Sequence, residues 1–146
     1  KKNSKGVTLN YWNPVDDLYN DKYTESMWYY VSSIQKDLAA RASWCITDEK
    51  EEAPVLSIQE SLDIKADKGT TIELHISKEE HVLYKAKYYK EASSYKGNVS
   101  VNLDDSIKID IPEDVESGDI LHIIIEATND YKHRLSRFKQ IIITIN

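Results

Sequence analysis

The sequence predicts a mainly β protein: an immunoglobulin-like antiparallel β-sandwich of seven or eight strands, preceded by one long α-helix. Three observations lead to this prediction. Apolar residues recur every three or four positions in one segment before residue 48, which is typical of a helix. After Pro54 they recur every second position in several short segments, which is typical of strands. Pairs such as Lys-Gly, Asp-Asp and Ser-Gly separate these segments, and no helical pattern alternates with them, so a parallel α/β sheet is not expected.

Length, charge and cysteine content limit the classes of protein to consider. The chain has 146 residues, enough for one ordinary domain and an appendage. Its net charge of −6 argues against nucleic acid or an anionic membrane as partner, because phosphate contacts need a basic surface. One cysteine, Cys45, excludes an intrachain disulfide. Because the chain opens without Met or an apolar signal core, we expect it to be part of a longer protein.

The helix is expected to begin after Thr24, a suitable N-cap, and to continue for about 20 residues. The residues of its apolar stripe are Met27, Val31, Ile34, Leu38 and Ala42. Such a stripe must be buried against another surface, and Cys45 is expected to pack there as well. The aromatic-rich residues 1–23 are expected to form an ordered coil.

Short runs of alternating residues define the expected strands. They cover residues 54–59, 61–66, 71–76, 82–89, 99–103, 106–111, 120–127 and 140–145. In the fourth run, alternation turns Tyr84 and Tyr88 toward the core and leaves Tyr89 on the wet face with two lysines.

No catalytic, metal-binding or cofactor-binding motif is present. The acidic stretch "PVDDLYND" lacks the glycine and distal glutamate of an EF-hand loop. The four histidines have no zinc-ligand spacing, and we expect a structural, hydrogen-bonded role for His122. We therefore expect no catalytic residue, no metal and no cofactor.

The segment "YYKEASSYKG", residues 88–97, is the candidate ligand-binding site, through Tyr89, Tyr95 and Glu91. Exposed tyrosine rings stack on flat sugar faces and keep the phenol as a polar handle. In the other interpretation these residues form a tyrosine corner, in which hydroxyl groups tie loops together. The sequence leaves both interpretations open.

Two longer stretches, "YKAKYYKEASSYKGNVSV" and "IDIPEDVESGDILHIIIEATNDYKHRLSRFKQIIITI", resemble the C-terminal domain of bacterial proteins described as cellulose-binding. The matching residues are Tyr84, Tyr89, Glu91, Ala92, Tyr95, Pro112, Gly118, His122, Glu126, Asp130, Leu135, Arg137 and Phe138. The sequence departs from the family where its two strand tryptophans are replaced by Ala86 and Lys87, and where "SKEEHVL" replaces an Asp-Pro-Asp-Gly-Asp loop.

The segment "IQKDLAARASWC" resembles the end of the nucleoside-hydrolase-like domain that precedes this C-terminal domain in the family. The resemblance implies that residues 1–50 are the helical tail of that domain and that residues 51–146 are the immunoglobulin-like sandwich. It also implies a secreted parent protein, extracellular or periplasmic, that is a hydrolase, while this chain alone is catalytically inert.

Two functions follow from the resemblance and the residues. In the first, the sandwich is an accessory module that binds a polysaccharide such as cellulose or supports the hydrolase-like domain. In the second, it is a purely structural or protein-interaction domain without affinity for glycans.

Overall fold

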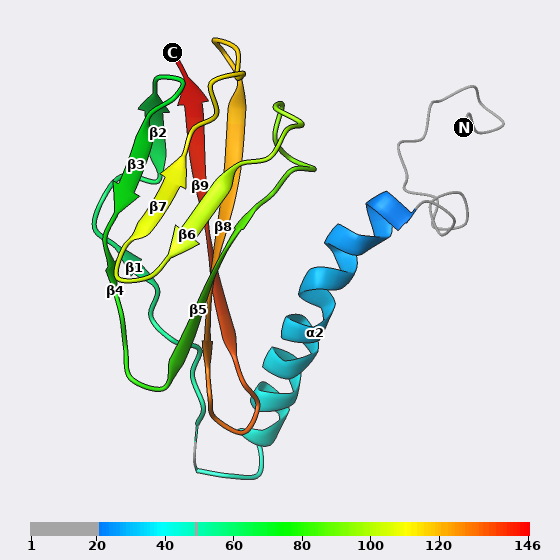
Figure 1. The fold of residues 1–146 in the computed structure, drawn as a ribbon. Helices are drawn as coiled ribbons and strands as arrows, with labels where there is room; N and C mark the ends of the chain where they lie inside the picture. The colour runs from blue at the N-terminus through cyan, green and yellow to red at the C-terminus, as the bar shows by residue number, and fades with distance from the viewer. Residues whose placement is uncertain (1–20, 49) are drawn as a thin grey trace, which may run out of the picture. The chain divides into compact units, whose positions relative to one another are not determined.

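The computed structural model describes residues 21–48 and 50–146 (Figure 1). The acidic stretch "PVDDLYND" and the expected coil therefore lie almost entirely outside the described residues. The chain divides into two compact units, Lys1–Ile34 and Gln35–Asn146, and each is considered by itself below.

Helix α2 spans Asp21–Ser43, so it begins three residues before the expected N-cap at Thr24. Within the second unit, Arg41 Nε donates to Asp37 Oδ2 over 2.7 Å, one turn away, and the guanidinium lies 5.8 Å from the Trp44 ring centroid. Three residues of the "IQKDLAARASWC" segment thus contact one another at the end of the helix.

The apolar stripe of α2 is not buried as expected. Ile34 is 64% exposed and Leu38 is 67% exposed. Cys45 is also exposed, so it does not pack against a surface within the described residues as expected. The nearby Ala40 is buried.

Nine strands follow the helix. They are β1 (Ser57–Ile58), β2 (Asp63–Ala66), β3 (Thr71–Leu74), β4 (Ile76–Ser77), β5 (Val82–Tyr88), β6 (Ser100–Leu103), β7 (Ile107–Asp110), β8 (Ile120–Asn129) and β9 (Ser136–Ile145). They form a four-stranded sheet in the order β2-β9-β8-β5, a three-stranded sheet β3-β7-β6 and the pair β1-β4 (Figure 1).

The mainly β class with one preceding helix is confirmed for the described residues, but two details of the prediction were wrong. Nine strands in three sheets replace the seven or eight expected. The pairing is not wholly antiparallel, because β2 runs parallel to β9, with Asp63 opposite Ile142.

The additional strand arises at His75, where the run predicted as one strand divides into β3 and β4. The main-chain N–H of His75 donates to Glu60 Oε2 over 2.8 Å, and the His75 carbonyl accepts from the N–H of Gln59 over 3.1 Å. These bonds take the backbone out of the β3-β7 ladder, so that Ile76 pairs with Ile58 in a different sheet.

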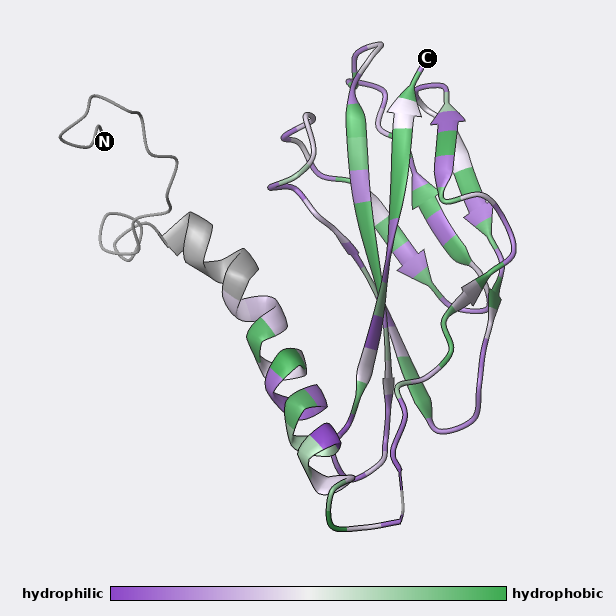
Figure 2. Ribbon diagram, turned by 180° about the vertical axis from the view of Figure 1, so that it is seen from behind, coloured by the Kyte–Doolittle hydropathy of each residue, from purple (hydrophilic) through white to green (hydrophobic). Residues whose placement is uncertain are grey.

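The two larger sheets share one hydrophobic core. Ile107 and Ile109 of β7 and Ile123 and Ile141 of the four-stranded sheet are all fully buried in the same cluster. Figure 2 shows the alternation of hydrophobic and hydrophilic residues along these strands. Burying such side chains contributes roughly 1.5–3 kcal/mol each, so this shared core is the main source of stability for the β unit.

Among the described residues, no helix has the length and hydrophobicity needed to cross a membrane.

Candidate functional site

The loop that follows β5 forms a hydrogen-bonded corner. Tyr88 donates its hydroxyl proton to the carbonyl of Tyr95 over 2.5 Å, and the Tyr95 hydroxyl donates to Asp114 Oδ1 over 2.7 Å. Both tyrosines pack against the core. A Cβ atom on Gly97 would lie about 2 Å from the Tyr95 hydroxyl, so the absence of a side chain at Gly97 makes room for this ring.

Two serines tie the same loop to β8. The buried Ser93 donates its hydroxyl proton to the Tyr89 carbonyl over 2.8 Å and accepts from the His122 N–H over 2.9 Å. Ser94 donates to Asp119 Oδ1 over 2.6 Å and accepts from the Ile120 N–H over 2.8 Å. The loop is thereby fixed relative to the sheet.

Hydrogen bonds and burial shift the pKa values of three side chains at this corner. The Asp114 carboxylate accepts the Tyr95 proton and raises the pKa of Tyr95, and burial raises the pKa of Tyr88. The Ser94 hydroxyl lowers the pKa of Asp119. All three shifts favour the hydrogen-bonded forms described above at neutral pH.

The three predicted site residues differ in their exposure and hydrogen bonds. Tyr95 is half-buried and its hydroxyl is engaged in the corner. Glu91 is exposed. Tyr89 is half-buried, whereas the sequence predicted it to be exposed, because it continues β5 beside β8: its N–H donates to the His122 carbonyl over 2.7 Å. Within the described chain the Tyr89 phenol makes no hydrogen bond.

Tyr89 lies on the outer face of the four-stranded sheet. Tyr88 pairs with the core residue Ile123, so alternation puts Tyr89 and its neighbour His122 on the opposite side. Gln140 Nε2 lies 2.5 Å from His122 Nδ1. The Gln140 amide donates in this contact, which leaves the proton of the imidazole on Nε2. His122 therefore has the hydrogen-bonded role predicted for it.

The outer face of this sheet thus offers a half-buried ring with polar groups beside it. The phenol of Tyr89, the His122 ring, the Gln140 carbonyl and the Lys87 ammonium come from three adjacent segments and point to the same side by alternation. Donors and acceptors around an aromatic ring are suited to a ligand with many hydroxyl groups.

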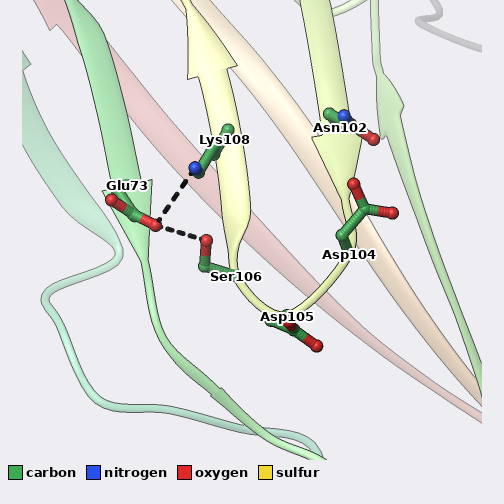
Figure 3. Close-up of a pocket in the computed structure, with 6 residues that line it drawn as sticks. All are labelled: Glu73, Asn102, Asp104, Asp105, Ser106 and Lys108. Atoms are coloured by element: carbon green, nitrogen blue, oxygen red, sulfur yellow. Dashed lines mark hydrogen bonds and ion pairs between the residues drawn. The ribbon is translucent and has the colours of Figure 1, made fainter.

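A second candidate is a shallow pocket of about 370 Å³ on the three-stranded sheet (Figure 3). Its lining residues are Glu73, Asn102, Asp104, Asp105, Ser106 and Lys108. Ser106 Oγ donates to Glu73 Oε1 over 2.5 Å, and Lys108 Nζ lies 3.7 Å from the same oxygen. The Ser106 hydroxyl lowers the pKa of Glu73. The lining has no aromatic ring. The bonds attach the β6-β7 hairpin to Glu73 of β3, so a structural role explains the pocket.

Within residues 21–48 and 50–146, no group of three or more histidine, cysteine or acidic side chains could hold a metal ion. The described residues thus form a mainly β unit after the helix. The outer face of its four-stranded sheet carries polar side chains around the half-buried ring of Tyr89.

Comparison with known proteins finds a family model that matches part of the β unit. The model of the family "Cellulose-binding protein Sde0182, C-terminal domain" matches residues 77–145, a little under half of the chain. The resemblance found in the sequence is thereby confirmed over that segment.

A solved structure is similar to the larger part of the chain. It is a nucleoside hydrolase-related hypothetical protein from Saccharophagus degradans, described as associated with carbohydrate metabolism. The two share 22% identity with a TM-score of 0.72 over 81% of this chain, which shows a common fold. This chain spans about a third (32%) of that protein. The search of curated proteins gave no match.

Proposed function

We propose that the β unit is a non-catalytic accessory domain that binds carbohydrate through the outer face of its four-stranded sheet at Tyr89. The observation that carries this proposal is the position of Tyr89: it lies opposite His122, which is hydrogen-bonded to Gln140, and its main chain bonds to His122 and Ser93. A site whose main chain is already fixed loses little conformational freedom when a ligand binds.

Each group on this face has a defined task in the proposal. The Tyr89 ring stacks on a sugar face and its phenol bonds to a hydroxyl group. His122 Nε2–H donates, Gln140 Oε1 accepts, and the exposed Glu91 carboxylate accepts from vicinal hydroxyls. Tyr95 contacts no ligand: it positions the loop through its bond to Asp114.

The domain organisation is part of the proposal. Residues 1–50 form the helical tail of a nucleoside-hydrolase-like domain, and residues 51–146 form the accessory β domain of a secreted protein. The name of the matching family supports this arrangement, and so does the likeness to the nucleoside hydrolase-related protein, of which this chain spans 32%. The likeness to that protein concerns the fold alone. In this proposal any catalytic activity belongs to the preceding domain.

Binding is tested with insoluble cellulose, a panel of soluble glycans and four forms of the chain: the unchanged protein, Tyr89→Ala, Tyr89→Phe and Trp28→Ala. Trp28 is a matched control, because it is another exposed ring, on α2. We expect the unchanged chain and Trp28→Ala to bind equally. We expect Tyr89→Ala to bind about fivefold more weakly, since one ring contact is worth roughly 1 kcal/mol, and Tyr89→Phe to retain most of the affinity.

Thermal unfolding of each variant separates loss of binding from loss of fold. Binding by the unchanged protein with an equal loss in Tyr89→Ala and Trp28→Ala would contradict the assignment of the site. Absence of binding to every glycan would contradict the proposed function itself.

A structural support role is the second candidate, favoured by one observation: the apolar side chain of Leu38, near the end of α2, is 67% exposed. We propose that the preceding hydrolase-like domain covers it.

This role is tested by Leu38→Asp in two proteins, the present chain and a longer one that includes the preceding domain. Support predicts a lower unfolding temperature in the longer protein and little change in the present chain. An equal, small effect in both would leave α2 without a supporting role.

A further inference from the structure

Among the described residues, strand β5 forms one margin of the four-stranded sheet, where β8 is its only neighbour (Figure 1). It has seven residues, whereas the other strands at the margins of the two larger sheets, β2, β3 and β6, have four each. All seven pair with β8 in unbroken register, from Val82 opposite Asn129 to Tyr88 opposite Ile123. Folded proteins usually keep such margins short, bulged or covered, because an open margin attracts other strands. β5 is therefore the strand of this protein best suited to pair with another chain.

Alternate residues of β5 turn their main-chain groups away from β8. At one end the Tyr89 N–H donates to the His122 carbonyl over 2.7 Å. At the other end the Asp130 N–H donates to the His81 carbonyl over 3.0 Å. Bonded and unbonded pairs alternate in an antiparallel ladder, so the odd-numbered residues of β5 bond to β8. The N–H and C=O groups of the even-numbered residues point to the open margin, and no hydrogen bond from a described residue engages them; these residues are Val82, Tyr84, Ala86 and Tyr88.

Apolar side chains border the same margin. Strand β6 is an outer strand of the three-stranded sheet and contacts β5. The core-facing residues of the two strands pack against the core but are only half-buried; they are Val82, Tyr84, Ala86, Tyr88, Val101 and Leu103. A strand that joined β5 would place every second side chain on their side of the sheet. The side chains that such a strand presents to them should therefore be apolar.

The charges on the outer side of β5 distinguish between possible occupants. β5 carries two lysines and no acidic residue, and Glu126 is the one acidic residue of β8, so this pair of strands has an excess of positive charge. A second copy of this chain, paired through its own β5, would bring Lys85 and Lys87 close to their counterparts. Like charges across a strand pair destabilise it, whereas opposite charges stabilise it. The excess charge therefore favours an acidic strand over a second copy.

We propose that β5 is a docking edge for an extended segment of a partner protein in which apolar and acidic residues alternate. The segment joins the sheet beside β5 and bonds through its main chain to the open groups of Tyr84 and Ala86. Its apolar side chains contact the margin toward β6, and its acidic side chains lie opposite Lys85 and Lys87. This inference goes beyond glycan binding at Tyr89 and does not depend on it.

The test uses the full chain and an acetylated peptide of alternating valine and glutamate, long enough to pair with the whole of β5. Amide hydrogen exchange, followed by NMR, is the readout. In the free protein we expect slow exchange at Leu83 and Lys85, which bond to β8, and fast exchange at Tyr84 and Ala86. The peptide should slow the exchange at Tyr84 and Ala86. A peptide of the same composition with its valines and glutamates in two blocks should not.

Two variants separate the main-chain contacts from the charges. Ala86→Pro removes a donor at the open margin and none that bonds to β8, so the protein should fold and lose the peptide. Lys85→Glu should bind the glutamate peptide about fivefold more weakly and should prefer a peptide with lysine in place of glutamate. Lys65→Glu is the matched control, because Lys65 is an exposed lysine of β2, at the other margin of the sheet. It should bind as the unchanged protein does.

Four results would overturn the inference. Slow exchange of Tyr84 and Ala86 in the free protein would mean that the edge is already covered. No slowing of these amides by the peptide would exclude strand docking at β5. Equal binding of the glutamate and lysine peptides would exclude an acidic partner. Self-association of the unchanged protein that slows the same two amides would make a second copy the occupant. Each of these results leaves glycan binding at Tyr89 in place.

Discussion

At the scale of single residues, Tyr95 and Tyr89 have different tasks although they belong to one short segment. Tyr95 donates to Asp114 and accepts, at its carbonyl, from Tyr88. Tyr89 has only its main chain engaged within the described residues. One tyrosine fixes the loop and the other is available on its surface.

Tyr95→Phe should therefore lower the urea midpoint of unfolding, because Asp114 loses its donor, while the ring keeps its packing. Glycan binding at Tyr89 should persist in the folded variant. Asp114→Asn should lower the pKa of Tyr95, measured by ultraviolet titration, since the Asp114 carboxylate raises it above 10.0 in the unchanged protein. Tyr89→Phe is the control, and a midpoint as low as that of Tyr95→Phe would refute the division of tasks.

The contact between His75 and Glu60 predicts a pH dependence. His75 Nδ1 lies 2.6 Å from Glu60 Oε1, which raises the pKa of His75 above 6.5 and lowers that of Glu60 below 4.5. Because folding raises the pKa of His75, the protonated ring stabilises the fold below pH 6.5. This contribution is lost as the pH rises through the pKa of His75 in the folded state. Because folding lowers the pKa of Glu60, the ionised carboxylate stabilises the fold above pH 4.5. This contribution is lost as the pH falls through the pKa of Glu60 in the folded state.

The pair should thus contribute fully between pH 4.5 and 6.5. Proton NMR titration of His75 should give a pKa that drops toward 6.5 in Glu60→Gln. The ring proton chemical shifts of His81, whose partner is Asp130, are the control and should be the same in the unchanged protein and in that variant. An unchanged His75 titration would show that the contact is absent in solution.

Residue positions were predictable where alternation decides them. Alternation predicted that Tyr84 and Tyr88 face the core, and both pack against it. The hollow of about 140 Å³ beside Tyr131 was not predicted, because residues 52–55 and 79–82 reach Tyr131 only in the folded chain.

At the scale of elements, the linker between α2 and β1 is attached to the β8-β9 connection at two points. Asn129 bonds to the Glu52 carbonyl, and its Oδ1 accepts from the Leu135 N–H over 2.9 Å. Glu51 Oε2 accepts from the His133 N–H over 3.0 Å, a bond that lowers the pKa of Glu51. The linker is therefore an ordered part of the β unit.

Asn129→Ala should destabilise the protein by about 1–3 kcal/mol, because it leaves buried main-chain groups without partners. Urea denaturation measures this loss, and hydrogen exchange should show faster exchange in residues 51–55. Asn102→Ala, at an exposed position of β6, is the matched control. Equal stability of the two variants would mean that the linker is not held by Asn129.

The strands could be predicted where the local sequence alternates between apolar and polar residues. The runs around β5, β7 and β8 alternate clearly, and these strands form where expected. The first half of β9 was missed because residues 136–140 are mostly polar, and they join the sheet only by pairing with β8. The break at His75 depends on a carboxylate 15 positions away, which no local pattern reveals.

At the scale of the whole molecule, one core holds the two larger sheets together. Ile123→Ala removes a fully buried side chain from that core and should cost about 2–5 kcal/mol. Ile120→Ala, three positions away and 39% exposed, should change stability by no more than about 0.5 kcal/mol. Urea unfolding followed by the circular dichroism of the β-sheet measures both, and similar values would contradict a core at Ile123.

The mainly β class could be predicted because strands with one buried face must alternate. The parallel pairing of β2 with β9 could not be predicted from the sequence. Alternating apolar residues fit a parallel and an antiparallel neighbour equally well, so the direction depends on the complete topology. This pairing joins segments near the two sequence ends of the β unit, since Asp63 pairs with Ile142, 79 positions further along.

That pairing has a consequence for synthesis in the cell. A ribosome adds about 5–20 residues per second, so β2 waits roughly 4–16 s for the strand that completes it. Once β8 is made, it too lacks a neighbour until β9 follows, because β9 lies between β2 and β8. The nascent chain therefore exposes unpaired strand edges until β9 emerges, and this is the stage at which a chaperone would protect it from aggregation.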